Sequence, residues 1–393
     1  MPGALDYLKE RLAELDEQGL LLRERELEGP TGARARFDGR EVINLASNNY
    51  LGLSNHPRMN AAASKAAAEL GAGSGAVRTI AGTMSMHREL EQRFAAFKHA
   101  EDSVMFQSGF TANAGTVAAI LDKGDVIVSD RLNHASIIDG ARLSRAEIKV
   151  FEHKDAGHAD RLLEETKAPD RRQLLISDGV FSMDGDIAPL PDLVEVAERH
   201  RAIMMVDDAH ASGVLGRQGA GTVDHFGLHG RVDVQVGTLS KAIGVLGGFV
   251  AGPGDLIEWL RNRGRPYLFS TSAPPAVTAA CLEALDIIAD EPERIERLWT
   301  NTRSFKAGLH ELGFDTGESE TPITPVITGE EEATQTFARR LFEEGVFCPA
   351  IVFPTVARGR ARVRTIVTAD HTQDDLAEAL ETFGRAGAEL GLR

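Results

Sequence analysis

The sequence predicts an α/β fold in which a mostly parallel seven-stranded sheet is covered by helices and followed by a smaller α+β domain. Between about residues 57 and 285, short apolar runs alternate with helical stretches. Such alternation is typical of a parallel sheet with helices on both faces. After residue 286 the pattern changes to long helices with two short strands. We therefore expect three parts, 1–56, 57–285 and 286–393, with the first packing against the last.

The elements are expected in a definite order along the chain. A charged amphipathic helix over 4–28 precedes a short strand at Glu41–Ala46. The seven strands of the large domain are expected at Ser103–Phe106, Val126–Ser129, Ile148–Phe151, Leu174–Ser177, Ile203–Asp207, Val234–Gly237 and Phe249–Ala251, with helices at 111–121, 135–144, 157–166 and 189–200. The last domain is expected to hold helices at 292–312, 331–344 and 373–390, and strands at Thr324–Ile327 and Arg362–Val367.

Composition excludes several classes of protein. Of the 393 residues, 42% are apolar and 26% charged, and the net charge is −16. Nucleic-acid and anionic-membrane binders need a basic surface, so neither partner is expected. The two cysteines, Cys281 and Cys348, form no CxxC pair, which favours a reducing compartment and gives no zinc-ligand set. No signal-type segment or membrane-length apolar run is present, so we expect a cytoplasmic protein.

A lysine and an aspartate each follow an apolar strand. Lys241 lies in TLSKAIGVLGG, and Asp207 ends the strand Ile203–Asp207. Taken singly, the lysine could be a solvated loop residue and the aspartate a helix cap or a surface ion pair. Ligands of parallel sheets bind beyond the carboxyl ends of the strands, so both side chains could reach one crevice. An amine that forms a Schiff base and an anion for a pyridinium nitrogen together indicate pyridoxal phosphate (PLP).

Three further stretches could complete such a site. FQSGFTAN, which contains Gly109 and Phe110, leaves a strand and opens a helix, so its free N–H groups could bind a phosphate. His134 in NHAS could stack on a flat ring, and Ser182 in DGVFSMDG could contact a ring oxygen. The alternatives are a simple helix entry, a satisfied core histidine and an ordinary turn. GAGSG at 71–75 follows a helical stretch and is no full GxGxxG, which argues against a nicotinamide site.

The motifs together resemble those of the α-oxoamine synthases, PLP-dependent enzymes of fold type I that join an amino acid to an acyl-CoA. The resemblance runs from about residue 20 to 393 and rests on SNNYLGLSNHP, GAGSGAVRTIAGT, LNHASIIDG, DGVFSMDG, VDDAHASGVLG, TLSKA and RPYLFSTS. LNHASIIDG, DGVFSMDGDIAPL and RPYLFSTS look most like glycine C-acetyltransferases. The expected reaction therefore condenses glycine with acetyl-CoA to 2-amino-3-oxobutyrate and CoA. The alternative is 8-amino-7-oxononanoate synthesis from alanine and pimeloyl-CoA with loss of CO2, or dual specificity.

The resemblance also implies how the cofactor is held. Lys241 would carry PLP as a covalent Schiff base and act as the base at the substrate's Cα. Asp207 would pair with the ring nitrogen, and His134 would stack on the ring. The ring oxygen would be contacted by Ser182 and His210, and the phosphate would be held by Gly109, Phe110 and Thr238. Ser270 and Thr271 would reach the phosphate bound by the other subunit, which implies a homodimer with a composite active site. Many aminotransferases carry a phosphate-binding arginine shortly after the lysine, and none is present here.

The same resemblance implies substrate contacts. Asn48 and Arg364 would bind the substrate carboxylate, Thr355 would lie near the acyl group, and Arg23 could approach the CoA. Guanidinium suits a carboxylate because it can bind both oxygens at once. Arg362 is expected to point away from Arg364. Rival interpretations are an aminotransferase, which the missing arginine opposes, and a non-catalytic protein that kept the fold. Lys241, Asp207, His134 and Arg364 occurring together oppose the second rival.

Overall fold

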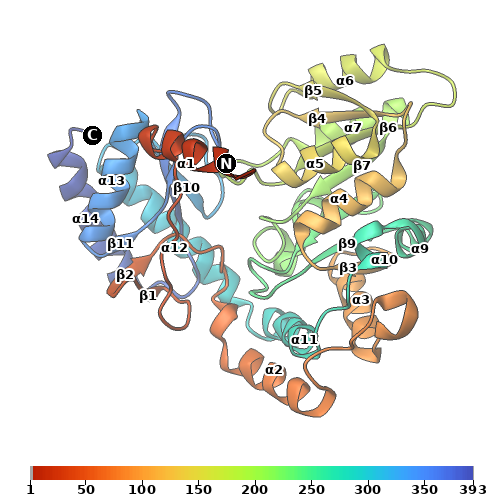
Figure 1. Cartoon of the computed structure of the whole chain (residues 1–393), viewed down its shortest axis with the longest axis horizontal. Helices are drawn as coiled ribbons and strands as arrows, with labels where there is room; N and C mark the ends of the chain where they lie inside the picture. Colours follow the sequence, from red (N-terminus) through yellow and green to blue (C-terminus); the bar gives the residue numbers. More distant parts are fainter. Residues whose placement is uncertain (1–2, 393) are drawn as a thin grey trace.

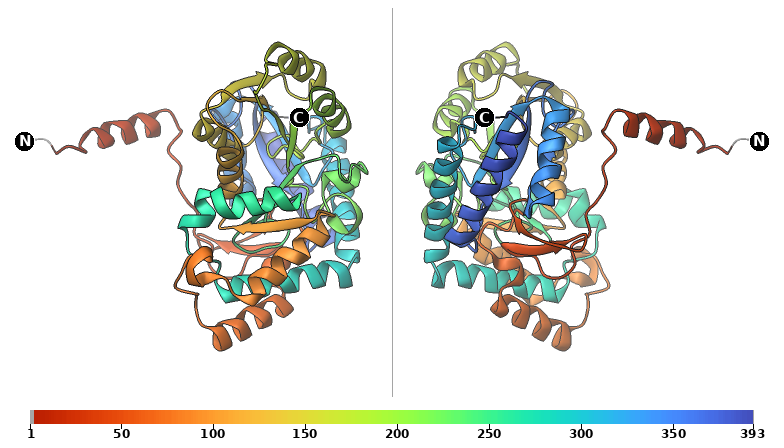
Figure 2. Two further views of the ribbon diagram at one scale, coloured as in Figure 1. Left: turned by 90° about the vertical axis from the view of Figure 1, so that its right-hand side faces the viewer. Right: turned by 90° about the vertical axis from the view of Figure 1, so that its left-hand side faces the viewer.

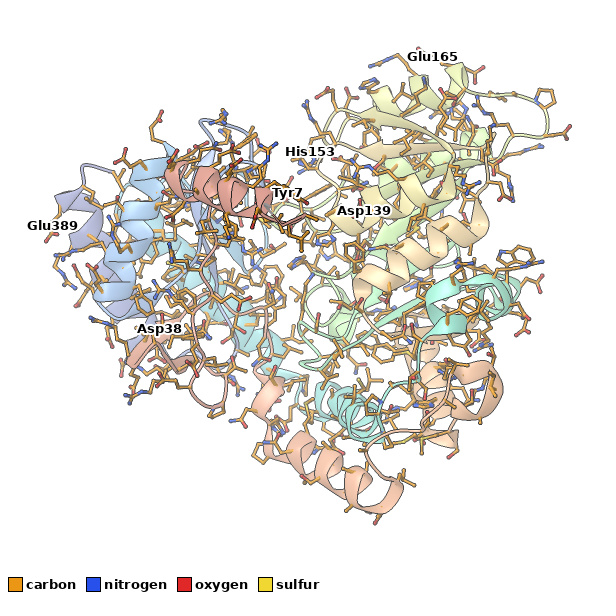
Figure 3. The ribbon with its side chains drawn as sticks, viewed as in Figure 1. Tyr7, Asp38, Asp139, His153, Glu165 and Glu389 are labelled. Carbon is orange, nitrogen blue, oxygen red and sulfur yellow. The ribbon has the colours of Figure 1, made fainter. Side chains whose placement is uncertain are left out.

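A computed structural model of the chain describes residues 3–392 and shows two lobes (Figure 1). The larger lobe contains a seven-stranded sheet, and the smaller contains two three-stranded sheets. Figure 3 shows the labelled Glu165 at the far end of the larger lobe, and Asp38 and Glu389 on the smaller one. The division of the chain after residues 56 and 285 stays a prediction.

The seven strands lie in the order β3-β9-β8-β7-β6-β4-β5. Their bounds are β3 Asp102–Phe106, β4 Val126–Asp130, β5 Glu147–Phe151, β6 Gln173–Asp178, β7 Ile203–Asp207, β8 Val234–Thr238 and β9 Gly248–Gly252. β4 to β8 run parallel, whereas β9 is antiparallel to both β8 and β3. The predicted mostly parallel sheet is confirmed, and the carboxyl ends of the parallel strands meet at one edge.

The central strands carry apolar side chains on both sides, and helices cover both faces of the sheet and bury them. One face packs against α4 Gly109–Ile120, α5 Ala135–Ser144, α9 Gly254–Arg263 and α10 Arg265–Phe269. The other packs against α6 Ala156–Glu165 and α7 Leu190–His200. Ile127 belongs to the first core, and its neighbours Val126 and Val128 to the second, as the alternation of side chains along a strand requires.

A third group of helices packs beside the β9 end of the sheet. It comprises α2 Pro57–Leu70, α3 Ser85–Phe97 and α11 Pro275–Asp290. Phe94 of α3 stacks on Phe249 of β9 with ring centroids 4.5 Å apart, which fixes α3 against the sheet. The short helix α8 Thr222–His225 lies in the connection between β7 and β8.

The smaller lobe joins the two ends of the chain. Its sheets are β1 Arg34–Phe37, β2 Arg40–Asn44 and β11 Val346–Phe347, and β10 Ile323–Gly329, β13 Ala361–Ile366 and β12 Ala350–Ile351; its helices are α12 Glu293–Glu311, α13 Glu331–Glu343 and α14 Gln373–Glu389. β2 pairs in parallel with β11, so residues near the start of the chain share a sheet with residues 346–347. Phe305, Phe337 and Phe383 fill the core between these elements. Over residues 3–392, no helix is both long and apolar enough to span a membrane.

The helix predicted over 4–28 is wrong in its length, because α1, Tyr7–Glu17, ends eleven residues earlier than expected. Gly19 follows in a left-handed conformation (φ 67°), and its carbonyl accepts a hydrogen bond of 2.7 Å from Gln335 Nε2 of α13. From there the chain runs to the small lobe. Figure 2 shows α1 projecting from the body, and none of its residues is buried. Its leucines, Leu8, Leu12 and Leu15, are therefore exposed.

Candidate active site

A cavity of about 240 Å³ lies at the carboxyl ends of the parallel strands. Five strands, β3, β4, β6, β7 and β8, deliver side chains to it from their last residues or from the turns that follow, as is usual for parallel sheets. Its lining includes many of the residues predicted from the sequence: Gly109, Phe110, His134, Ser182, Asp207, His210, Thr238 and Lys241. Segments more than 100 residues apart in the chain thus meet in one crevice.

Lys241 lies three residues after the end of β8 and is withdrawn from solvent. Burial, which disfavours the ammonium ion, lowers the pKa of Lys241 to about 8. The carboxylates of Asp207 and Asp178 oppose this shift, and the guanidinium of Arg364 adds to it. At pH 7 roughly one amine in ten is then neutral, against fewer than one in a thousand for an ordinary lysine. Such an amine can act as a nucleophile.

The Asp207 carboxylate is held in place at the end of β7. It accepts hydrogen bonds from Asn113 Nδ2 at 2.6 Å and from the Ala209 amide at 2.8 Å. Asn113 lies on α4 and also donates to Ser136 Oγ of α5 at 3.0 Å. We did not predict a role for Asn113, although it lies one helical turn after Gly109 and so on the same face of α4.

A second carboxylate, Asp178, lies beside Asp207 on the neighbouring strand. Burial and the negative charge of Asp207 raise the pKa of Asp178 well above its usual value. One of its oxygens accepts a hydrogen bond of 3.1 Å from the His134 amide. Asp178 therefore anchors the start of α5 and readily takes up a proton. The sequence placed it in DGVFSMDG, but we assigned it no role.

His134 caps the start of α5 and lines the cavity. Its Nδ1 lies 2.7 Å from Ser136 Oγ and accepts from the Ser136 amide at 3.2 Å. Burial lowers the pKa of His134; Asp207 opposes the shift and Lys241 strengthens it. These contacts fix the plane of a mostly neutral ring at the wall of the cavity.

The start of α4 forms the polar end of the cavity. Ser108 caps the helix by accepting from the Thr111 amide at 3.1 Å, and the first N–H groups of an α-helix have no acceptor within the helix. A Cβ on Gly109 would lie 3.0 Å from Thr238 Cβ, so glycine lets the helix start approach β8 closely. Thr238 Oγ1 lies 2.8 Å from Ser240 Oγ at the same place. Amides and hydroxyls arranged in this way suit a phosphate.

His210 is buried and pairs with a residue that we had not singled out. Tyr50 Oη lies 2.7 Å from His210 Nδ1. Burial raises the pKa of Tyr50 far above its usual value, so its hydroxyl keeps its proton and donates. Burial also lowers the pKa of His210 well below its usual value, with Lys241 and Arg364 adding to the shift. A neutral His210 that accepts at Nδ1 must carry its proton on Nε2, where it can donate to a ligand.

Arg364 approaches the site from β13 of the small lobe. One of its Nη atoms donates to the Ser182 carbonyl at 3.0 Å. Within residues 3–392, neither Arg364 Nε nor the buried Asn48 Oδ1 has a hydrogen-bond partner. A buried guanidinium with unused donors fits a bound carboxylate. The expectation for Arg362 was wrong: residues two apart in a strand share a face, and Arg362 donates at 3.0 Å to the Met183 carbonyl in the same loop.

Asn48 and Arg364 are not among the residues that line the cavity, and four other predicted residues do not line it either. Ser270 and Thr271 follow α10, and Thr271 pairs with Val77 in an isolated bridge. Thr355 is exposed in the loop between β12 and β13. Arg23 is exposed and pairs with Asp16 at 3.0 Å. Their suggested roles stay predictions.

A buried ion pair between Lys98 and Asp208 lies directly after Asp207, at the end of β7. Lys98 Nζ donates to Asp208 Oδ2 at 2.7 Å and to the Ala220 carbonyl at 2.6 Å, and both side chains are fully buried. The Thr222 amide donates to the same carboxylate at 3.0 Å. A Cβ on Gly221 would lie 2.0 Å from Asp208 Oδ2, so no other residue fits this turn. The sequence showed Asp208 but gave no indication of its partner.

Comparisons with known proteins agree with this arrangement. The family model described as aminotransferase class I and II matches residues 40–383. An 8-amino-7-oxononanoate synthase of Symbiobacterium thermophilum is 61% identical over 98% of this chain and 99% of its own length. The 8-amino-7-oxononanoate synthase 1 of Bacillus subtilis is 53% identical over 100% of both chains. A solved serine palmitoyltransferase from S. paucimobilis with bound PLP–myriocin superposes with a TM-score of 0.93 at 31% identity, covering 99% of this chain and 98% of that one.

The expected subgroup was wrong. Curated relatives at 53–61% identity over essentially the whole chain are 8-amino-7-oxononanoate synthases, not glycine C-acetyltransferases. Of the motifs that suggested the glycine enzyme, LNHASIIDG and DGVFSMDGDIAPL contribute side chains to the cavity, whereas RPYLFSTS lies outside it, and none of the three distinguishes one acyl group from another. The fold, the cofactor class and the acyl-transferring reaction type are supported by the relatives. The chain belongs to the aminotransferase class I and II family of PLP-dependent fold type I enzymes, within its α-oxoamine synthase group.

Proposed function

We propose that this protein condenses alanine with a seven-carbon dicarboxylic acyl-CoA (pimeloyl-CoA) to form 8-amino-7-oxononanoate, CoA and CO2. Full-length identity of 53–61% to enzymes of that name is the observation that carries the choice of product. The carbon count is consistent: three carbons of alanine and seven of the acyl group lose one as CO2 and leave nine. The reaction is the alternative that the sequence motifs left open.

The residues of the cavity fit PLP. Lys241 offers a desolvated amine, Asp207 a fixed carboxylate for the ring nitrogen, and the start of α4 with Thr238 a set of donors for the phosphate. We propose that Lys241 holds the cofactor covalently and that His134 stacks on its ring. When bound, PLP supplies an electron sink that stabilises negative charge at the substrate's Cα.

The other steps belong to side chains of this chain. Lys241 would lie in the cavity as the base that takes the proton from the substrate's Cα. Asp207 keeps a proton on the ring nitrogen, and Asn113 keeps Asp207 in place. His210 Nε2 and Ser182 donate to the ring oxygen, and the Tyr50 hydroxyl sets the tautomer of His210. His134 orients the thioester oxygen. The Cα attacks the thioester carbon, the C–S bond breaks, and CoA leaves as the thiol with the proton that was taken from Cα. The bond from Cα to the carboxylate then breaks, CO2 leaves, and a proton from solvent takes its place at Cα.

Arg364 and Asn48 are proposed to bind the carboxylate of alanine, and this gives a prediction. Replacing Arg364 with lysine removes the two-pronged donor but keeps the charge. Because a hydrogen bond to a charged group contributes about 1.5–3 kcal/mol, we expect kcat/KM for alanine to fall roughly 10–100-fold. Steady-state kinetics should show the loss in KM for alanine and little change in KM for the acyl-CoA. Arg303→Lys, on the exposed side of α12, is the matched control; an equal loss in both variants would contradict the assignment.

We further propose a homodimer with a composite site. Three large apolar side chains, Ile80, Leu246 and Phe269, are 83%, 65% and 71% exposed, and the first and last lie on elements that contact each other, the turn 78–82 and α10. Isolated apolar residues on a surface are ordinary, but large apolar side chains left open to solvent on neighbouring elements suit an interface. Ser270 and Thr271 lie beside this group and could therefore reach the phosphate in the other subunit. Cys281 and Cys348 are both buried free thiols, as a cytoplasmic location would allow.

The proposed substrates are tested by offering the enzyme four combinations of an amino acid and an acyl-CoA. Purified holoenzyme is offered alanine or glycine with pimeloyl-CoA or acetyl-CoA, and products are identified by mass. We expect 8-amino-7-oxononanoate, CoA and CO2 in equal amounts from alanine with pimeloyl-CoA. We expect kcat/KM to be lower with the other three pairings. Preference for acetyl-CoA with either amino acid would overturn the proposed product while leaving the reaction class intact.

A further inference from the structure

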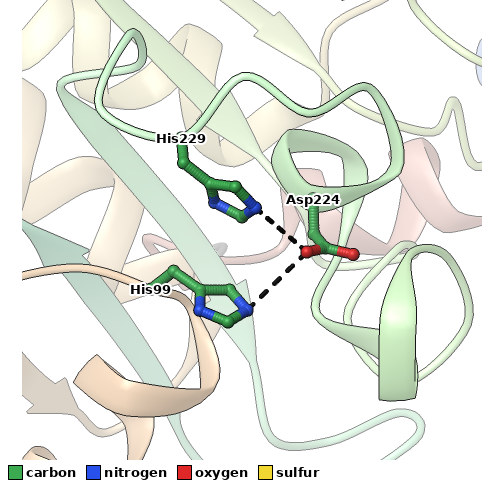
Figure 4. A group of neighbouring side chains, drawn as sticks. All are labelled: His99, Asp224 and His229. Carbon is green, nitrogen blue, oxygen red and sulfur yellow. Dashed lines mark hydrogen bonds and ion pairs between the residues drawn. The ribbon is translucent and has the colours of Figure 1, made fainter.

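Outside the active site, two histidines direct their ring nitrogens at one carboxylate. His229 Nε2 lies 3.0 Å and His99 Nε2 3.6 Å from Asp224 Oδ1 (Figure 4). The three potential ligand atoms all lie within 4.8 Å of one another. His99 follows α3, whereas Asp224 on α8 and His229 both lie in the connection between β7 and β8, so two separate segments meet here.

The spacing fits a metal ion as well as the hydrogen bond that His229 makes with Asp224. Zinc bound tetrahedrally by nitrogen and oxygen at about 2.0–2.1 Å separates neighbouring ligand atoms by roughly 3.3–3.4 Å. The two observed nitrogen-to-oxygen distances, 3.0 and 3.6 Å, lie on either side of that value. Asp224 is 2% exposed, whereas His99 and His229 are 46% and 32% exposed, so an ion could enter from solvent with a fixed carboxylate behind it.

The backbone supports this orientation. His99 has φ 53°, in the left-handed region that most residues other than glycine avoid. His229 Nδ1 is buried and has no hydrogen-bond partner among residues 3–392. A neutral ring whose Nε2 binds a metal carries its proton on Nδ1, and that proton would need an acceptor or a water.

Arg217 competes with an ion for the same carboxylate. Its side chain donates to Asp224 Oδ1 at 2.7 and 3.1 Å, and its amide donates to Oδ2. Burial alone would raise the pKa of Asp224, but the hydrogen bonds from Arg217 and His229 lower it to about 2. The Arg217 side chain is 76% exposed and could swing into solvent while the amide contact to Oδ2 remains. Because the Asp224 side chain is only 2% exposed, an ion that displaces Arg217 has to take over the charge of this carboxylate.

We propose that His99, Asp224 and His229 form a binding site for a divalent transition metal of the zinc class, with solvent as the fourth ligand. Imidazole with a carboxylate suits Zn²⁺, Co²⁺ or Ni²⁺ better than Mg²⁺ or Ca²⁺. The site is structural: it joins the end of α3 to α8 directly outside the Lys98–Asp208 pair, and His99 is the residue after Lys98. It does not depend on the proposed reaction.

Titration calorimetry of the untagged, chelator-treated holoenzyme with Zn²⁺ tests the site. The visible d–d absorption of Co²⁺, at wavelengths where PLP does not absorb, serves as a second readout. We expect one ion per chain. Loss of an outer-sphere partner weakens metal binding about 10–100-fold, so loss of a ligand in His99→Gln or His229→Gln should weaken it by at least that much.

Two controls make the result specific. His225→Gln removes an exposed histidine beside Asp224 and is expected to leave the affinity unchanged. Arg217→Gln removes the competing cation and is expected to tighten binding. Thermal unfolding without added metal checks that every variant folds like the parent. No one-to-one binding below ~1 mM Zn²⁺, or equal binding by the parent, His99→Gln and His229→Gln, would overturn the proposal.

Discussion

Lys241→Ala is expected to reduce the rate of the condensation by at least about 10⁴-fold, because both the covalent attachment point and the base at Cα are lost. The fold should survive, since alanine fits a cavity wall and removes a desolvated amine. Borohydride reduction of the parent holoenzyme should fix the cofactor's mass on the peptide that contains Lys241, whereas the variant should carry no such mass. Lys65→Ala, at an exposed position on α2, is the matched control. Trapping on another lysine in the parent would contradict the assignment.

The pKa of about 8 adds a pH dependence to this prediction. Only the neutral amine attacks an aldehyde, so capture of PLP by the apoprotein should speed up about tenfold per pH unit below pH 8 and level off above it. An unperturbed lysine would keep speeding up towards pH 10. The chain's α-amino group titrates in the same range, so stopped-flow rates should be paired with mapping of the trapped peptide. A rate that still rises steeply from pH 9 to 10 would contradict the desolvated environment.

Lys98→Met is expected to destabilise the protein by about 3–5 kcal/mol, because it leaves the Asp208 carboxylate buried without its partner. Lys98 Nζ also satisfies the Ala220 carbonyl, so two acceptors lose a donor. Urea unfolding should show the midpoint falling without a change in slope. Lys65→Met, on the exposed surface of α2, should change stability by less than about 0.5 kcal/mol.

A double variant separates the charge from the packing. Lys98→Met with Asp208→Asn removes both charges and keeps the shape of the pair, so it should be more stable than Lys98→Met alone. Replacing both members of a buried pair commonly costs less than removing one. If the double variant lost as much as the sum of the two single variants, the pair would have no coupling energy.

The fold was largely predictable because buried strands of a parallel sheet read as continuous apolar runs. The strand predicted at Ile203–Asp207 matches β7, and the helix predicted at 135–144 matches α5. α1 was predicted too long, since Leu20 to Leu27 continue a mixed apolar and charged pattern after the chain has left the helix at Gly19. A glycine in a charged, leucine-rich segment was the signal that could have ended the prediction.

The residues of the site that directly follow a strand could be predicted from the sequence. Those that depend on a contact between side chains far apart in the sequence could not. Asp207, Lys241 and the start of α4 could be found because each follows an apolar run. Tyr50 with His210, and Lys98 with Asp208, lie 160 and 110 residues apart, and no periodicity connects them. The predicted substrate subgroup was wrong for a related reason: the motifs LNHASIIDG and DGVFSMDG contribute to the cavity at the strand ends, and none of the quoted motifs distinguishes one acyl chain from another.

The projecting helix α1 should be the part of the chain most open to proteolysis in solution. An isolated helix of 11 residues is marginal in water, and α1 buries none of its side chains within its own chain. A protease should therefore remove it quickly from a lone subunit. If a second subunit covers the leucines, dilution should speed the cut and concentration should slow it. The fraction of chains in a stored sample that have lost α1 would then increase with the time that the subunits had spent dissociated.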